Sequence, residues 1–231
     1  MHVKSSIGSR RVGGVEGRSK KAEQAEATRA KLLRAARELF ARRGYANVGT
    51  EEIVRRARVT RGALYHHFRD KKDLFRAVHE QVEEELVESL GRQITGIEDA
   101  RELLATGVRS FLDACTDPAL AQISLLDAPS VLGWAEWREV DARYGMGLVK
   151  LGLEAAMEQG VIPRQDSDPL AHLLLAGLGE AALLIANADD PQAARREIEG
   201  PLLALLEGLQ TEGAQPSRSR LARGRRATTR S

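Results

Sequence analysis

The sequence predicts an all-α fold of about nine helices, with a small N-terminal three-helix bundle joined to a larger C-terminal bundle. Apolar residues recur every three or four positions along most of the chain, as they do in amphipathic helices. No segment shows the period-two alternation of a half-buried strand. Asp-Pro pairs beginning at Asp117, Asp168 and Asp190 each place a helix N-cap before a proline in the first turn.

The composition is that of a soluble globular protein with a sizeable core. Of the 231 residues, 42% are hydrophobic and 29% are charged, and the net charge is +2. The longest apolar run, residues 173–187, is interrupted by Glu180 and does not predict a membrane span. The N-terminus has no apolar signal segment and Cys115 has no second cysteine to pair with, so we expect a cytoplasmic protein without a membrane partner.

Positive charge is concentrated in residues 1–25 and 211–231. Both segments are poor in large apolar residues, so burial cannot offset the entropy lost on ordering. We expect basic disordered tails. An additional interpretation is that they attract nucleic-acid phosphates in a salt-dependent manner.

Local signals define the four helices of the N-terminal half. Gly44 is expected to end the first helix. Thr50, Thr60 and Asp70 are expected as N-caps of the next three, since Ser, Thr and Asp side chains accept hydrogen bonds from free N–H groups. The predicted ranges are 26–43, 50–57, 60–67 and 70–95.

The C-terminal half is predicted to contain five longer helices. The Gly200-Pro201 pair should kink or split the last of them, because proline cannot donate the helical hydrogen bond. The predicted ranges are 99–116, 118–126, 133–159, 169–187 and 191–209.

Residues 49–68 have the pattern of a helix-turn-helix, two short helices joined by a tight turn around Arg58. Apolar residues on one face of each helix should pack inward. The opposite face of the second helix carries Arg61, Gly62, Tyr65 and His66, which suit base edges and phosphates of a major groove. On composition alone, a solvated polar face of an ordinary helical bundle is an equally good interpretation.

The segment from Thr28 to residue 78, and above all TRGALYHHF at residues 60–68, resembles the DNA-binding domain of the TetR/AcrR family of bacterial regulators. The resemblance implies a DNA-binding domain at residues 26–80 and a regulatory and dimerisation domain at 81–210. Arg58 departs from the glycine common at this turn, and a positive φ there would cost on the order of 1 kcal/mol. The DNA contacts that the resemblance implies are Thr50, Thr60, Arg61, Gly62, Tyr65, His66 and Lys71.

The resemblance also implies a homodimer. The last two predicted helices carry leucine stripes that suit a bundle between two subunits, although internal core would need the same leucines. The expected interface residues are Leu174, Leu178, Leu202 and Leu206.

A ligand cavity is expected within the C-terminal helices, because Trp and Met suit an adaptable apolar pocket. Large apolar residues at helical spacing are, however, also ordinary core. The candidate lining residues are Phe111, Cys115, Leu126, Trp134, Trp137, Met146 and His172.

These observations predict a transcriptional regulator that binds double-stranded operator DNA, acts as a repressor and is released by an unidentified small molecule. The alternatives are a ligand-independent regulator or activator of the same family, or a helical interaction adaptor. No catalytic motif, metal-binding cluster or cofactor loop occurs in the sequence, so we expect no enzyme activity, metal or cofactor.

Overall fold

The computed structural model describes residues 15–210, and every regular element in that range is a helix, as predicted. Residues 118–132 form one continuous helical stretch, made of α6, a π-helical middle η1, and α7. Counted as one, this stretch brings the described chain to the nine helices expected. The elements are α1 (Val15–Arg43), α2 (Thr50–Ala57), α3 (Arg61–His67), α4 (Lys71–Ile94), α5 (Ala100–Cys115), α6 (Pro118–Leu120), η1 (Ala121–Asp127), α7 (Ala128–Leu132), α8 (Trp134–Glu158), α9 (Ser167–Ala186) and α10 (Pro191–Gly208).

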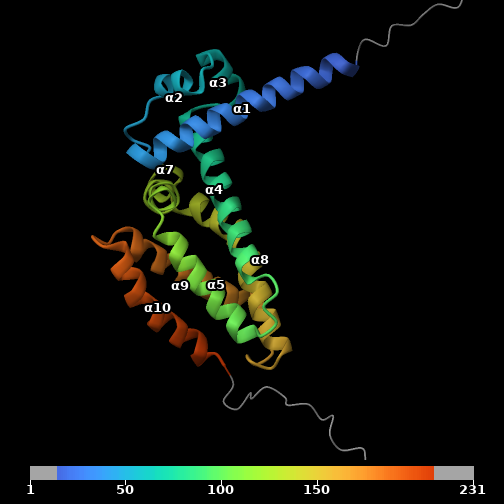
Figure 1. Ribbon diagram of the computed structural model, residues 1–231, viewed down its shortest axis with the longest axis vertical. Helices are drawn as coiled ribbons and strands as arrows, with labels where there is room; N and C mark the ends of the chain where they lie inside the picture. The colour runs from blue at the N-terminus through green and yellow to red at the C-terminus, as the bar shows by residue number, and fades with distance from the viewer. Residues whose placement is uncertain (1–14, 211–231) are drawn as a thin grey trace, which may run out of the picture.

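The helices form two bundles connected by α4 (Figure 1). At one end α1, α2 and α3 pack around the first half of α4. The second half of α4 runs into the other bundle, where it packs against α5 and α8. The 118–132 stretch lies between the two and contacts both α1 and α4. The N-terminal and C-terminal bundles are therefore joined by a continuous helix and by a second, lateral contact.

The predicted capping signals explain most helix starts. Thr60 Oγ1 accepts the N–H of Ala63 at 3.1 Å, and Asp70 Oδ1 accepts the N–H of Asp73 at 2.7 Å. Asp117 and Asp190 cap α6 and α10 in the same manner, each followed by proline. Gly44 ends α1 with a φ of 73°, a left-handed conformation that glycine adopts without strain.

Several predicted boundaries are wrong. The first helix begins at Val15 instead of residue 26, because Glu, Lys, Ala and Gln in residues 15–25 favour helix even without an apolar stripe. The cap of α2 is Gly49 in place of Thr50, and that of α9 is Asp166 in place of Asp168. The disordered tail predicted for residues 1–25 is therefore wrong for residues 15–25, which are helical. Residues 1–14 and the tail predicted for residues 211–231 lie outside the described residues.

Two predicted interruptions of helices are also absent. The stretch expected to end at Leu126 continues through Pro129 to residue 132, with the proline in the first turn of α7, where it is tolerated. Pro201 does not split α10, which is one helix.

The core around the helix-turn-helix includes residues from much later in the chain. Leu32, Phe40, Ile53, Leu64 and Phe75 are fully buried there. The 118–132 stretch and the start of α8 complete it with Ile123, Ala128, Leu132 and Trp137. Two further clusters lie between α5, α8, α9 and α10.

Candidate nucleic-acid interface and internal cavity

The exposed face of α3 gathers the side chains predicted for groove recognition. Arg61, Gly62, Tyr65 and His66 are all exposed. The Arg61 guanidinium lies 5.5 Å from the centre of the Tyr65 ring and 2.8 Å from Glu51 Oε1 on α2. Both partners of this ion pair are well exposed, so the pair contributes little stability and can open when a phosphate or base competes for the arginine.

The opposite face of α3 fixes its position. Leu64 is fully buried and Phe68, at the end of the helix, is nearly so. The guanidinium of Arg29 on α1 lies 5.6 Å from the centre of the Phe68 ring. Because α3 has only seven residues, its orientation depends on these tertiary contacts rather than on its own helical stability.

Lys71, at the start of α4, makes contacts inside the protein. Its Nζ points into the protein and donates to the carbonyl oxygens of Tyr45 at 2.8 Å and Val48 at 2.9 Å. The same ammonium group lies 3.8 Å from the centre of the Tyr45 ring. Burial lowers the pKa of Lys71. Two of its three donors are thus used internally, where they fix the loop between α1 and α2, and the phosphate contact of Lys71 stays a prediction.

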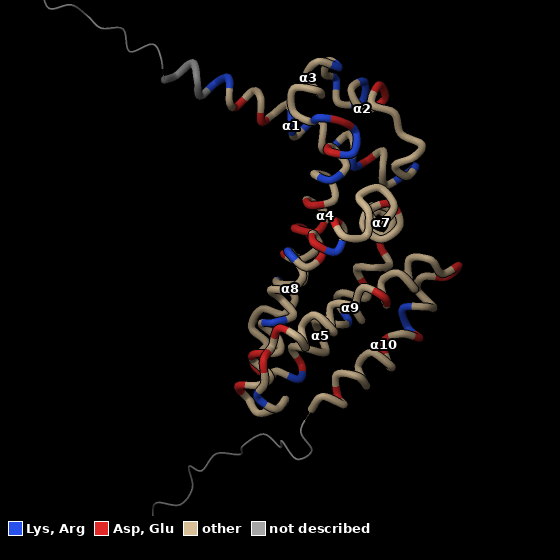
Figure 2. The backbone as a smooth tube through the Cα atoms, turned by 180° about the vertical axis from the view of Figure 1, so that it is seen from behind, with Lys and Arg blue, Asp and Glu red and all other residues tan. Residues whose placement is uncertain are grey.

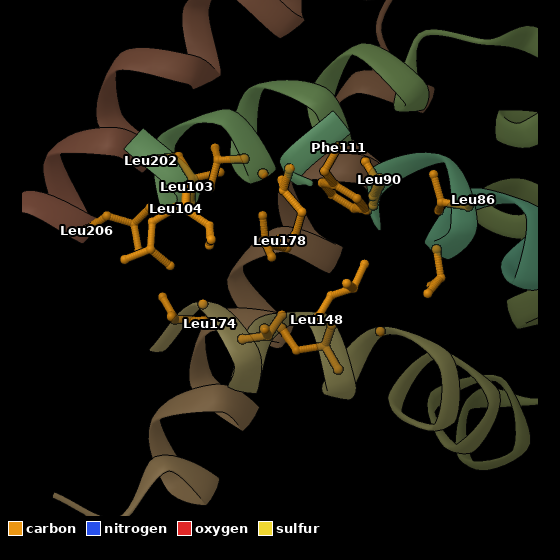
Figure 3. Close-up of a pocket in the computed structure, with 18 of the residues that line it drawn as sticks. Leu86, Leu90, Leu103, Leu104, Phe111, Leu148, Leu174, Leu178, Leu202 and Leu206 are labelled. Atoms are coloured by element: carbon orange, nitrogen blue, oxygen red, sulfur yellow. The ribbon is translucent and has the colours of Figure 1, made fainter. Parts of the chain in front are cut away.

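An apolar cavity of about 120 Å³ lies inside the C-terminal bundle, between α4, α5, α8, α9 and α10. Leucines dominate its wall, with Phe111 at one side (Figure 3). Glu83 and Asp141 are the two lining residues in the described chain that carry polar side chains. A space of this size and composition suits a small, mostly apolar molecule.

Of the predicted cavity residues, Phe111 lines the cavity and the other six do not. Trp134 is 63% exposed, and Leu126 and His172 are exposed as well. Cys115 and Met146 belong to neighbouring apolar clusters, and Trp137 belongs to the helix-turn-helix core. The error arose because the tryptophans lie at the start of α8, near the N-terminal bundle, whereas α8 lines the cavity with later residues, from Asp141 to Gly152.

Glu83 connects the cavity to a small polar cluster. The Ser124 hydroxyl in η1 hydrogen-bonds the Glu83 carboxylate and lies 3.2 Å from His79 Nδ1. Burial raises the pKa of Glu83 to about 7 and lowers the pKa of His79 to about 4. The backbone oxygen of Ser124 also accepts the indole N–H of Trp137 at 3.1 Å. The sequence did not predict Glu83 or Asp141 in this cavity wall. An acidic residue on a helix rich in charge is ordinarily expected to face solvent.

The same π-helical segment contacts the helix-turn-helix domain. Three residues after Ser124, the Asp127 carboxylate accepts the backbone N–H of Tyr45 at 2.7 Å. A second link is made by Glu136, which pairs with Lys72 and Arg76 on α4. A path of direct contacts therefore runs from the cavity wall through η1 to the loop that precedes α2.

Comparison with known proteins agrees with this architecture. Residues 32–78 match the bacterial regulatory proteins of the tetR family, and residues 101–209 match a tetracyclin repressor-like C-terminal domain. A solved TetR-family regulator from Pectobacterium atrosepticum is 36% identical, with a TM-score of 0.75 over 82% of this chain and 97% of its own. The chain belongs to the TetR family.

Two other relatives extend the likeness of this TetR-family regulator. The Tn10 TetC protein of Escherichia coli is 28% identical over 69% of this chain and 81% of its own length. RolR, solved in complex with resorcinol, is 26% identical with a TM-score of 0.64 over 80% of this chain and 89% of its own. This TetR-family chain is accordingly a transcriptional regulator with a helix-turn-helix DNA-binding domain.

TetR-family proteins act as dimers, and the four leucines predicted for the interface also have contacts inside one chain. They line the cavity, and two of them are buried in the chain itself. Leu174 and Leu178 are partly exposed. The interface prediction is therefore wrong for Leu202 and Leu206, and it stays a prediction for Leu174 and Leu178.

The outer side of the same helices remains uncovered. Leu173 is 72% exposed and Leu184 54% exposed on α9, and Leu205 is 67% exposed on α10. Figure 2 shows α9 almost free of charged residues. Within the described chain, α9 is also the one helix long and apolar enough to cross a membrane by length and composition. The same apolar character suits a helix that borders an internal cavity.

No group of three His, Cys, Asp or Glu side chains in residues 15–210 is arranged to hold a metal ion. His66 and His67 are adjacent, and their ring centres lie 5.2 Å apart.

Proposed function

We propose that this chain is a homodimeric repressor that occupies operator DNA with two copies of α3 and leaves it when a small molecule fills the cavity. The observation that carries this proposal is the face of α3, where Arg61, Tyr65 and His66 are exposed on a helix anchored by buried residues. Gly62 belongs to the same face, and Thr50 and Thr60 stand at the starts of α2 and α3. The repressor-like description of the C-terminal domain and the resorcinol complex of RolR support release by a ligand.

In this proposal, residues 26–80 bind DNA, and residues 81–210 bind the regulatory ligand and form the dimer. A ligand changes DNA affinity only if it binds one spacing of the two DNA-binding domains more tightly than the other. Half-sites one helical turn apart, about 34–36 Å, set the spacing that a repressor dimer has to match. We place this activity in the bacterial cytoplasm, where operator DNA lies.

The test is a gel shift on duplexes selected from a random pool by the purified protein. Arg61→Ala and Tyr65→Ala should each weaken specific binding by about 1–3 kcal/mol, because each removes one contact to a base edge. Arg92→Ala, which removes an equally exposed arginine near the far end of α4, is the matched control. If both α3 variants bind the selected duplex as tightly as the control, the proposed recognition surface is wrong. A promoter that becomes more active when the protein binds would indicate an activator.

A further inference from the structure

The cavity wall holds two acidic groups in an otherwise apolar surface. Among the described lining residues, only Glu83 and Asp141 carry polar side chains. Glu83 is almost fully buried, so water does not screen its charge. An ionised carboxylate in such a position is costly unless a positive charge or several donors balance it.

The balance of charge around the two carboxylates is incomplete. Asp141 has a cationic partner, because Arg138 Nη1 lies 2.9 Å from its Oδ2. The ion-pair partner found for Glu83 among residues 15–210 is His79, with Nδ1 3.6 Å from Oε1. Burial keeps that histidine uncharged near neutral pH. When Glu83 and Asp141 are both ionised, the two negative charges are therefore balanced by one positive charge, that of Arg138.

We propose that the cavity binds a small hydrophobic amine, with its ring among the leucines and its ammonium group against Glu83. The proposal rests on the proposed function, in which this cavity is the effector site. The volume of about 120 Å³ is close to that which holds one aromatic ring. An ammonium supplies the absent charge through a charge-assisted hydrogen bond. A neutral alcohol of the same shape does not, and a carboxylate adds a further negative charge.

The groups around Glu83 determine how binding depends on pH. Burial, with the nearby Asp141, raises the pKa of Glu83 to about 7. Burial also raises the pKa of Cys115 and of Tyr144, so neither carries charge near neutrality. Binding of an ammonium should therefore strengthen as pH rises through about 7 and should release a proton below it. The groups that face Glu83 are His79 on α4, Ser124 on η1, Cys115 on α5, and Asp141 and Tyr144 on α8. Arg138 pairs with Asp141.

The experiment is calorimetry of the full chain with benzylamine, benzyl alcohol and benzoate, which share one ring and differ in charge. At about pH 8 we expect benzylamine to bind at least about tenfold tighter than benzyl alcohol, with benzoate weakest. Glu83→Gln, which keeps the shape of the side chain, should lose the preference for the amine and still bind the alcohol. Glu84→Gln, on the exposed side of α4, should behave as the wild type.

Equal affinity for amine and alcohol, no binding of any of the three, or an unchanged preference in Glu83→Gln would each overturn the proposal. A second test needs no variant. Below about pH 7, benzylamine binding to the wild type should release a proton, which calorimetry in two buffers of different ionisation enthalpy measures. Operator binding by the unliganded protein is measured separately. If it persists while the amine preference fails, only the ligand class is wrong; if it is absent, the proposed function itself fails.

Discussion

At the scale of single residues, Arg58 has a strained backbone conformation. It is the one non-glycine residue with positive φ in the described range, at φ 55° and ψ 44°. A side chain in this left-handed conformation costs roughly 1–2 kcal/mol. The sequence predicts such strain only if Arg58 has a positive φ, and the structure has this positive φ.

Arg58→Gly should therefore raise the free energy of unfolding by about 1 kcal/mol, because glycine adopts positive φ without a Cβ clash. Urea unfolding monitored by circular dichroism measures the change. Arg55→Gly, at an exposed position inside α2, is the opposite control and should lower stability by about 1 kcal/mol, since glycine disfavours a helix interior. Equal effects of the two substitutions would contradict the assignment of strain to Arg58.

Glu83 should make stability depend on pH. Its pKa is about 7 in the folded chain against an ordinary value of 4.5, so the folded state binds more protons between these values. Its contribution to stability is therefore present at low pH and is lost as pH rises to about 7. His79, with a pKa lowered from 6.5 to about 4, acts in the opposite direction and masks part of this effect in the wild type.

Glu83→Gln isolates the contribution of the acid. The variant should gain stability relative to the wild type, by a few kcal/mol, as pH rises from about 4.5 to 7, because the amide has no charge to bury. Denaturant unfolding at several pH values measures the difference, and Glu84→Gln should show none. A difference that stays constant over that interval would argue against a raised pKa of Glu83.

The exposed face of α3 was predictable residue by residue, because in a seven-residue helix the spacing alone separates Arg61, Tyr65 and His66 from Leu64. The inward turn of Lys71 was not. Its position at the start of α4 is the same whether the side chain points to DNA or to two carbonyls, and only the loop that contains Tyr45 and Val48 decides between them.

At the scale of elements, η1 is the segment that joins the cavity to the DNA-binding domain. Ser124 contacts the Glu83 cluster on one side, and Asp127 holds the Tyr45 N–H on the other. π-Helical turns are uncommon and recur at functional positions. A shift of this segment on ligand binding would act directly on the loop before α2.

Asp127→Ala should weaken that link. We expect a loss of about 1–3 kcal/mol in stability, because a half-buried backbone donor is left without its charged acceptor. The same variant should respond less to a cavity ligand in DNA binding. Glu88→Ala, which removes an exposed ion pair with Arg92, is the control for loss of a surface carboxylate. A loss no larger than that of the control would show that the contact with Tyr45 contributes little.

Helix existence was predictable from apolar spacing and caps, whereas the boundaries at Val15 and Leu132 were not. The first turns of α1 lack an apolar face, so periodicity gives no signal there, and propensity alone maintains the helix. The turn predicted at Pro129 is absent, because the proline lies in the first turn of α7, where a helix tolerates it.

At the scale of the whole molecule, the uncovered leucines of α9 and α10 predict a dimer. Leu173→Glu combined with Leu184→Glu should convert the protein to monomers, because two charges would be buried in the subunit interface. Sedimentation equilibrium measures the change, and specific operator affinity should fall with it. Leu151→Glu, at an equally exposed leucine on α8, should leave the assembly intact. A double variant that remains dimeric would place the interface elsewhere.

The cavity and the interface could not be separated from sequence. Leu174 and Leu173 are neighbours on one helix, yet one lines the cavity and the other faces outward. Composition treats them alike, and only the packing of α5 and α10 against α9 distinguishes the two sides.

The continuity of α4 has a consequence for its length. Leu74 and Val78 lie in the core of the DNA-binding domain, while Leu86 and Leu90 lie in the cavity wall. One residue inserted between Val82 and Leu86 would rotate one set against the other by about 100° and lengthen the helix by about 1.5 Å. We therefore expect substitutions in α4 to be tolerated more readily than insertions or deletions. The number of residues in this helix sets the distance and the rotation between the two domains.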